Sequence, residues 1–336
     1  MFEDLKQAYL PRTRFPERTL DRDKCEKCLR CYEACPTYGF RIDADGFPEP
    51  HGYGGMEEAC LSCWNCVVVC PTGALTMKGT YFVPEGRYRS WVRGVPSFPD
   101  PLGRGGTAEA WEETEKKLTP VERVIYKRRS IRLFKDKPVP REMLARIVEA
   151  GRFAPSAGNC QPWKFTVVTD RAVIREMEHE AMKVLRRMKN LYYDPEGKRR
   201  AWRSALVTVS SLFMVNKMDP RPFTAVEKAD RCDEAIYWNA PAAIVIAKHG
   251  RGISNPDLDG GIAAQNMVLA AHSLGLGTCY IGLTIEPMRY PHMKRLREKL
   301  GIVPPWEPLT SIAVGYPKGK IDGIVERDHP PVEWVE

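Results

Sequence analysis

The chain has 336 residues and a basic charge balance, with 51 Lys and Arg against 43 Asp and Glu. This length accommodates one large domain, or an ordinary domain joined to a small one. No apolar run approaches the length of a membrane span, so we expect a cytoplasmic protein with no membrane contact. The modest positive charge suits anionic cofactors or acidic redox partners.

Cysteine is concentrated near the start of the chain, because eight of the eleven cysteines fall between residues 25 and 70. The segments CEKCLRCYEACP and CLSCWNCVVVCP repeat the spacing C-x2-C-x2-C-x3-C, and Pro36 or Pro71 follows each fourth cysteine. Dense cysteine in a reducing compartment indicates metal rather than disulfides. Zinc ribbons also use CxxC pairs, but zinc explains neither the third cysteine nor the shared proline. The pattern favours iron–sulfur clusters.

Residues 20–78 resemble the bacterial ferredoxins that hold two [4Fe-4S] clusters. The resemblance implies crossed ligation, in which the fourth cysteine of each motif binds the cluster of the other motif. The implied ligands of the first cluster are Cys25, Cys28, Cys31 and Cys70. The implied ligands of the second cluster are Cys60, Cys63, Cys66 and Cys35. Between the motifs, the pair Asp45-Gly46 predicts a small hairpin.

A stretch rich in proline and glycine follows the cysteine motifs and predicts a connector. Its aromatic residues are unusual for a free linker, so we expect an extended strap on the surface of the second domain. The predicted organisation is a ferredoxin-like domain over 1–78, the strap over 79–119, and a larger domain with a C-terminal arm over 120–336.

The larger domain alternates apolar patterns of helical and strand type, which predicts a central sheet covered by helices without deciding the strand order. The helices are expected over residues 141–153, 171–190 and 260–275, the last ending at Gly275. The strands are expected over residues 164–170, 240–250 and 309–317.

A basic segment, YKRRSIRLF, precedes the first of these helices and places Lys127 and three arginines around Ser130. One interpretation is an exposed basic loop. A phosphate site fits better, because guanidinium groups match phosphate oxygens bidentately. A nucleic-acid surface is a third interpretation, but no aromatic stacking platform or recognition helix accompanies the segment, so no nucleic acid is expected as a partner.

Residues 123–328 resemble the nitroreductase family of FMN-dependent oxidoreductases through three motifs, RRSIRLF, APSAGNCQPW and LGLGTCYIG. The resemblance implies an α+β fold and a homodimer with FMN at the subunit interface. The implied FMN contacts are Arg128, Arg129, Ser130, Arg132, Pro155, Ser156, Asn159, Ile281, Gly282, Leu283 and Arg327. Lys318 and Lys320 are alternatives to Arg327 at the phosphate. Residues 189–235 occupy the place where the family shapes its substrate pocket, and Cys160 and Cys279 are interpreted as small apolar side chains.

Together the two resemblances imply an oxidoreductase in which electrons pass through two clusters to FMN, which reduces a nitro, enone, quinone or similar acceptor. The electron donor is expected to be ferredoxin, flavodoxin or NAD(P)H, and flavin N5 carries the chemistry without a catalytic side chain. Two alternatives stay open: a relay that passes electrons to a partner protein, and a reductive dehalogenase.

Overall fold

The computed structural model of the chain describes residues 16–37, 39–50, 60–79, 96–192, 236–250, 252–253 and 255–336. The described residues fall into two compact units that do not follow chain order. Of the described residues, the first unit contains those up to 126 together with 188–192 and 324–336, and the second contains 127–187 together with those from 236 to 323. Among the described residues, no helix has the length and apolar character needed to cross a bilayer.

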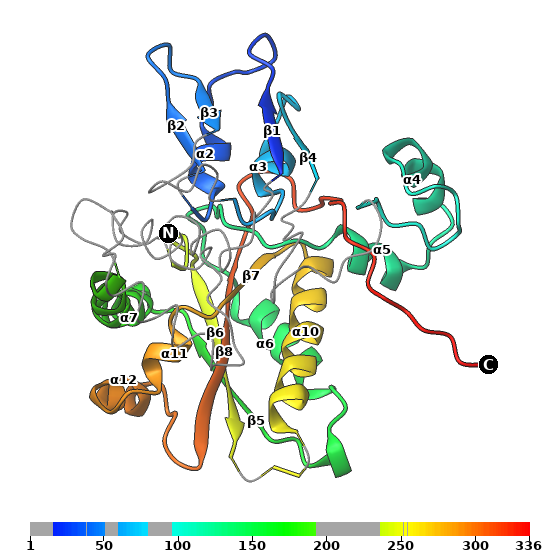
Figure 1. The fold of residues 1–336 in the computed structure, drawn as a ribbon. Coiled ribbons are helices and arrows are strands. Elements are labelled where there is room, and N and C mark those ends of the chain that lie inside the picture. Colours follow the sequence, from blue (N-terminus) through cyan, green and yellow to red (C-terminus); the bar gives the residue numbers. More distant parts are fainter. Residues whose placement is uncertain are drawn as a thin grey trace, which may run out of the picture. The chain divides into compact units, whose positions relative to one another are not determined.

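The first unit contains two small antiparallel sheets (Figure 1). Strand β1 (Glu17–Leu20) pairs with β4 (Leu75–Lys78), and β2 (Phe40–Ile42) pairs with β3 (Pro48–Pro50). The connection between β2 and β3 turns at Gly46, whose φ of 84° favours glycine. The predicted hairpin is therefore confirmed.

Two five-residue helices, α2 (Arg30–Ala34) and α3 (Asn65–Val69), carry part of the cysteine motifs. Each helix ends where a cysteine adopts an extended conformation, with ψ of 122° at Cys35 and 119° at Cys70. A proline follows each of these cysteines and disfavours helical backbone in the residue before it. The Cys-Pro pairs thus end both helices at the same point of the motif.

The expected strap contains a helix that the sequence analysis did not predict. Helix α4 (Ala108–Glu115) begins after Thr107, whose hydroxyl accepts a hydrogen bond from the Ala110 N–H at 3.2 Å. Trp111 is buried and stacks edge-on against Tyr126, at 5.8 Å between ring centroids. Helix α5 (Pro120–Lys127) follows directly. The many proline and glycine residues before residue 107 favour a connector, so the sequence pattern did not indicate this capped helix.

The second unit is built on one antiparallel sheet in the order β5-β6-β8-β7. Strand β6 (Ala242–His249) is buried along most of its length between β5 (Trp163–Val168) and β8 (Trp306–Gly315), and β7 (Gly277–Ile281) forms the outer neighbour of β8. The three predicted strands are confirmed within a few residues, and β7 adds a fourth.

Helices α6 (Arg141–Arg152) and α10 (Pro256–Ser273) pack on one face of this sheet and share its main apolar core (Figure 1). Helix α10 begins four residues before the predicted start, because Asn255 caps it through a 3.1 Å bond from the Leu258 N–H. Gly275, with φ of 77°, ends it as predicted. The remaining helices are α7 (Arg171–Tyr192), which was predicted, and the short α11 (Ile285–Met288) and α12 (Lys294–Lys299), which were not. This is the α+β architecture that the resemblance implied.

Candidate cluster and cofactor sites

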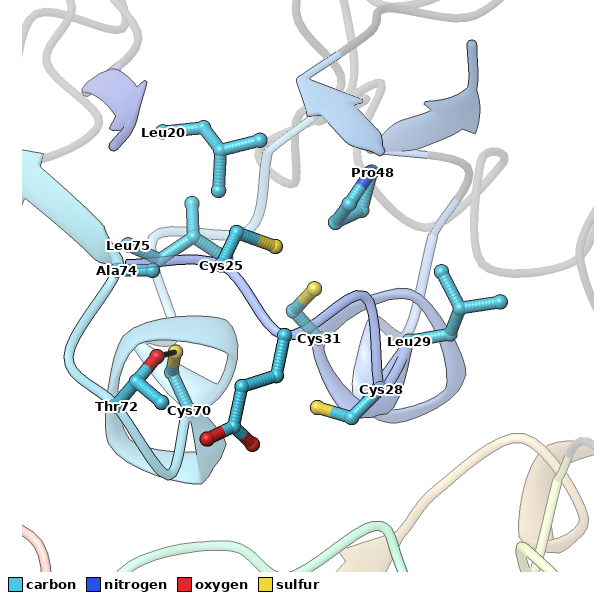
Figure 2. A pocket seen from close by; sticks show the side chains of 11 residues that line it. Leu20, Cys25, Cys28, Leu29, Cys31, Pro48, Cys70, Thr72, Ala74 and Leu75 are labelled. Atoms are coloured by element: carbon cyan, nitrogen blue, oxygen red, sulfur yellow. Dashed lines mark hydrogen bonds between the residues drawn. The ribbon is translucent and has the colours of Figure 1, made fainter. Parts of the chain in front are cut away.

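A pocket in the first unit is lined by cysteines from both motifs, and its empty volume is about 300 Å3. Figure 2 shows the four sulfur atoms of this pocket, three from the first motif and one from the end of the second. These cysteines are Cys25, Cys28, Cys31 and Cys70. Their sequence separation means that the fold, not a single loop, assembles this set.

The two cysteine loops have the same backbone conformation at equivalent positions. Lys27 and Leu29 have φ of 54° and 56°, and Ser62 and Trp64, at matching places in the second motif, have φ of 52° and 57°. Left-handed backbone costs a non-glycine residue roughly 1–2 kcal/mol. Strain of this kind at four matched positions indicates a functional constraint on both loops.

Hydroxyl groups approach one sulfur of each motif in the same way. Thr37 Oγ1 lies 3.5 Å from Cys35 Sγ, and Thr72 Oγ1 lies 3.6 Å from Cys70 Sγ. Burial raises the pKa of Cys70, but the Thr72 hydroxyl and nearby backbone N–H groups outweigh burial and lower it. Hydrogen bonds of this type favour the thiolate, which is the form that binds metal.

Cys31, the buried thiol of the first set, needs a cationic partner for ionisation. Burial raises the pKa of Cys31 to about 12, and the neighbouring thiols of Cys70 and Cys28 contribute to the rise. Thiolates packed together in this environment repel one another unless a metal neutralises them. The donor set therefore fits a metal–sulfur group.

The remaining four cysteines of the motifs form a second group, in which two buried thiols have raised pKa values. Burial raises the pKa of Cys60 to about 11 and that of Cys66 well above its ordinary value. The thiols of Cys63 and Cys35 raise both values further. Cys35, from the first motif, thus lies among the first three cysteines of the second motif.

The arrangement differs from a mononuclear metal site. Within the parts of the chain that the structure describes, no group of three or more His, Cys, Asp or Glu side chains is placed to hold a metal ion. Sulfur atoms spread around a pocket suit a polynuclear cluster, which presents several metal atoms to its ligands.

In the second unit, the basic segment runs beside β7. Ser130 forms a parallel bridge with Thr278, and the Ile131 N–H donates to the Thr278 carbonyl at 2.8 Å. Gly277 permits this approach, since a Cβ there would lie 2.7 Å from the nearest carbon of Ile131. The fold therefore brings together two motifs that are separated by about 150 residues in the sequence.

The chain after β8 runs along the other side of the basic segment. The Lys318 N–H donates to Leu133 O at 2.9 Å, and Arg129 Nη2 donates to Lys320 O at 2.5 Å. Arg129 is 7% exposed. Lys318 and Lys320 thus lie on a segment that contacts the predicted phosphate-binding residues.

Asp322 closes this region through an ion pair with Lys127 and a contact with the His272 imidazole. One of its oxygens lies 2.7 Å from Lys127 Nζ, and the other lies 3.1 Å from His272 Nε2. Burial lowers the pKa of His272, while the Asp322 charge acts in the opposite direction and the charges of Lys127 and Arg128 lower it further. The charges of Lys127 and Arg128 thus both act on this region, and positive charge of this kind favours an anion.

The loop after α6 has a fixed internal structure. The Gln161 N–H donates to Ser156 Oγ at 2.9 Å, and the Gln161 side-chain amide donates to Asn159 Oδ1 at 3.2 Å. Gly158 has φ of 57° and Asn159 has φ of 54°, so the loop makes a left-handed turn at two successive residues. Below it, the buried Asp259 accepts from the Ala157 N–H at 3.4 Å.

A buried hydroxyl network supports the segment after β7. The Tyr237 hydroxyl lies 2.9 Å from Thr284 Oγ1 and 2.8 Å from Ser311 Oγ, and the Ser311 hydroxyl donates to the Ile281 carbonyl at 2.9 Å. These three residues were not predicted from the sequence, where their only signal is a hydroxyl in an apolar neighbourhood. The network supports Ile281, the first residue of the predicted flavin contact at 281–283. At the next residue, Gly282, an added Cβ would meet no described atom within 4 Å.

The C-terminal segment belongs to the first unit rather than to the basic segment's unit. Arg327 pairs with Ser97 through two backbone hydrogen bonds of 3.0 and 2.9 Å. Val325 packs against the buried Cys60, Trp64 and Met77. The segment therefore contacts the apolar cluster that contains Cys60, one cysteine of the second group.

Three other predicted positions have definite outcomes. Cys279 is buried, as its interpretation as an apolar side chain requires, whereas Cys160 is exposed and does not fit that interpretation. Pro155 precedes the fixed loop and is exposed. Of the segment expected to shape the substrate pocket, residues 193–235 lie outside the described residues.

Comparison with known proteins identifies both parts of the chain. Residues 125–316 match the nitroreductase family, and residues 24–74 match the 4Fe-4S dicluster domain. A putative NADH dehydrogenase/NAD(P)H nitroreductase of Archaeoglobus fulgidus is 31% identical over 204 residues, which are 60% of this chain and 87% of the relative. A ferredoxin of Methanothermococcus thermolithotrophicus is 40% identical over 62 residues, 18% of this chain and 95% of the relative.

Among solved structures, a nitroreductase with bound FMN from Desulfitobacterium hafniense is 22% identical, with a TM-score of 0.48 over 65% of this chain and all of the other. The family match spans more than half of the sequence and includes the basic segment, the loop after α6 and β7. The chain therefore belongs to the nitroreductase family of FMN-dependent oxidoreductases and carries a 4Fe-4S dicluster domain ahead of the family domain.

Proposed function

We propose that the chain is a fused ferredoxin–nitroreductase that uses an external low-potential donor to reduce a small organic acceptor, such as a nitro compound, enone or quinone. When bound, the clusters supply one-electron transfer, and FMN supplies the exchange between one-electron carriers and two-electron reduction. The observation that carries the proposal is the joining of two cysteine groups and a nitroreductase domain in one polypeptide.

The proposed cluster ligands follow the two cysteine groups. Cys25, Cys28, Cys31 and Cys70 hold the first cluster, and Cys35, Cys60, Cys63 and Cys66 hold the second. Two observations support this assignment: the shared pocket that contains Cys70, and the effect of Cys35 and Cys63 on the pKa values of Cys60 and Cys66. The threonines that follow the two motifs stabilise one thiolate in each group.

The proposed FMN site combines the basic segment, the loop after α6 and the end of β7. The contacting residues are Arg128, Arg129, Ser130, Arg132, Pro155, Ser156, Asn159, Ile281, Gly282 and Leu283, with Arg327, Lys318 or Lys320 at the phosphate. The arginines bind the phosphate and stabilise negative charge on the flavin. The loop is preorganised by its internal hydrogen bonds, and the Tyr237 network fixes the Ile281 backbone.

We also propose that two copies of the chain form a homodimer with the FMN sites at the interface. Helix α5 supports this proposal, because none of its residues is buried, and Val121 and Ile125 are 64% and 46% exposed. Ile125→Lys should shift the mass measured by light scattering from dimer to monomer. The matched control Val303→Lys, at an apolar residue that is 42% exposed on the second unit, should stay dimeric.

The function is tested with protein purified and assayed without oxygen. We expect iron and sulfide for two [4Fe-4S] clusters and one FMN per chain, and turnover of at least one acceptor class with reduced methyl viologen as donor. A Cys63→Ser variant should retain FMN and lose most of the turnover. Turnover that survives this change refutes transfer through the second cluster, and turnover with no acceptor class favours the relay to a partner protein.

A further inference from the structure

A buried cation lies beside the second cysteine group. Arg18, on β1, is 9% exposed, and its Nη1 donates to Gly39 O at 2.7 Å. Its guanidinium also lies over the ring of Phe40, at 5.1 Å from the centroid. Lysine and arginine are almost never buried without a partner, so this position requires an explanation.

Gly39 joins Arg18 to a sulfur of the second group. A Cβ on Gly39 would lie 2.6 Å from Arg18 Nη1 and 3.1 Å from Cys35 Sγ. The glycine therefore leaves room in which the guanidinium and the sulfur approach each other. The Arg18 charge also reaches Cys60 and Cys66, whose pKa values burial raises and Arg18 lowers.

Arg18 has hydrogen-bonding capacity that the described residues do not use. Its Nε and Nη2 are buried and have no hydrogen-bond partner within the described part of the chain. A buried charged N–H group that lacks an acceptor destabilises the folded state by more than an ordinary hydrogen bond stabilises it. An anionic cluster with sulfur acceptors next to Cys35 would supply what these N–H groups lack.

The first cysteine group has a different electrostatic environment. The acidic Glu26 lines its pocket, whereas the equivalent position of the second motif is the apolar Leu61. Cys28 is exposed in the first group, while Cys35, Cys60 and Cys66 of the second are buried. Burial alone would make reduction of the second cluster harder, because reduction adds negative charge to a desolvated group.

We propose that Arg18 sets the relative reduction potentials of the two clusters, making the cluster at Cys35, Cys60, Cys63 and Cys66 the more readily reduced. Its positive charge offsets the burial penalty and stabilises the electron there. Between the clusters, one electron leaves the first and reduces the second, and no proton is required. This inference rests on the proposed function, since both clusters must be present. Arg18 acts on the cluster through its positive charge and is not one of its ligands.

The test measures the two cluster midpoint potentials by redox titration with electron paramagnetic resonance, using the full chain. Arg18→Met removes the charge at similar length and should lower the higher midpoint, so that reduction of that cluster becomes at least tenfold less favourable, about 59 mV for one electron. Arg18→Lys, which keeps the charge, should stay within threefold of the wild type. The control Arg22→Gln also removes one charge, but Arg22 has a 45% exposed side chain in surface ion pairs with Asp43 and Glu49, and both midpoints should stay unchanged.

The midpoint potentials of the two Arg18 variants either support or contradict the role of Arg18. If Arg18→Met leaves both midpoints within threefold, or lowers only the lower one, the inference is wrong. If Arg18→Met loses the second cluster, retention of that cluster by Arg18→Lys at its wild-type midpoint supports the charge requirement, and its loss there overturns it. Wild-type protein without two clusters would refute the proposed function as well, whereas two clusters with unshifted midpoints refute only the role of Arg18.

Discussion

The buried tyrosine below the 281–283 segment allows a quantitative test of how the second unit holds its candidate flavin contacts. Tyr237→Phe deletes one hydroxyl from a fully buried side chain, and with it the contacts to Thr284 and Ser311 at 2.9 and 2.8 Å. Each buried hydrogen bond contributes about 0.5–1.5 kcal/mol net, so the pair accounts for roughly 1–3 kcal/mol.

The orphaned hydroxyls do not add their full desolvation penalty to this figure. Ser311 and Thr284 lie 3.5 Å apart, and Ser311 keeps its bond to the Ile281 carbonyl. The expected loss of stability is therefore about 1–3 kcal/mol, and it should appear in β7 and the segment that follows. Hydrogen exchange followed by mass spectrometry resolves this region, whereas global unfolding of a chain with two compact units need not be two-state.

The matched control is Tyr290→Phe, at a tyrosine that is 47% exposed, which should change stability by less than about 0.5 kcal/mol. If Tyr237→Phe leaves exchange in β7 as slow as the control does, the hydroxyl network does not support this segment. The pH dependence gives a second readout, because burial raises the pKa of Tyr237 to about 12 from an ordinary value of 10.0. Between these values the folded state holds a proton that the unfolded state releases, so stability should fall as the pH rises, and less steeply in the variant.

Two further predictions concern backbone space and cluster ligation. Gly277→Ala should destabilise the second unit by about 1–3 kcal/mol, because the added carbon meets the buried Ile131. Gly261→Ala in α10 meets no described atom within 4 Å and should stabilise the unit by up to about 1 kcal/mol, and hydrogen exchange in the second unit compares the two variants. Cys70→Ser should abolish the first cluster and leave the second, halving the iron content, while the exposed Cys160→Ser should change neither; loss of the second cluster instead would show that ligation is not crossed.

The sequence predicts this protein best where the chemistry is local. The cysteine motifs, the Asp45-Gly46 turn and the glycine that ends α10 each require particular residues within a short stretch, so spacing alone identifies them. Apolar periodicity likewise located α6, α7, β6 and β8 within a few residues. The family motifs then predicted candidate flavin contacts, of which the fold places those of the basic segment beside β7.

Features that depend on distant partners were not predictable in this way. Strand order depends on how four strands pair across the whole domain, and helix α4 depends on a cap and a buried Trp111 within a stretch dominated by proline and glycine. Arg18 looks like one more surface charge in a basic chain until the fold places it next to Gly39. The partners of Tyr237 lie 47 and 74 residues away, so no local pattern reveals the network.

The packing of Val325 on Cys60, Trp64 and Met77 affects the order in which the protein can be assembled. Translation produces the cysteine motifs early, but residue 325 emerges only after the whole second unit has been synthesised. The side of the second cysteine group that Val325 covers thus stays bare in the nascent polypeptide. Cys60 therefore lacks this cover until the last residues of the chain return to pack against it.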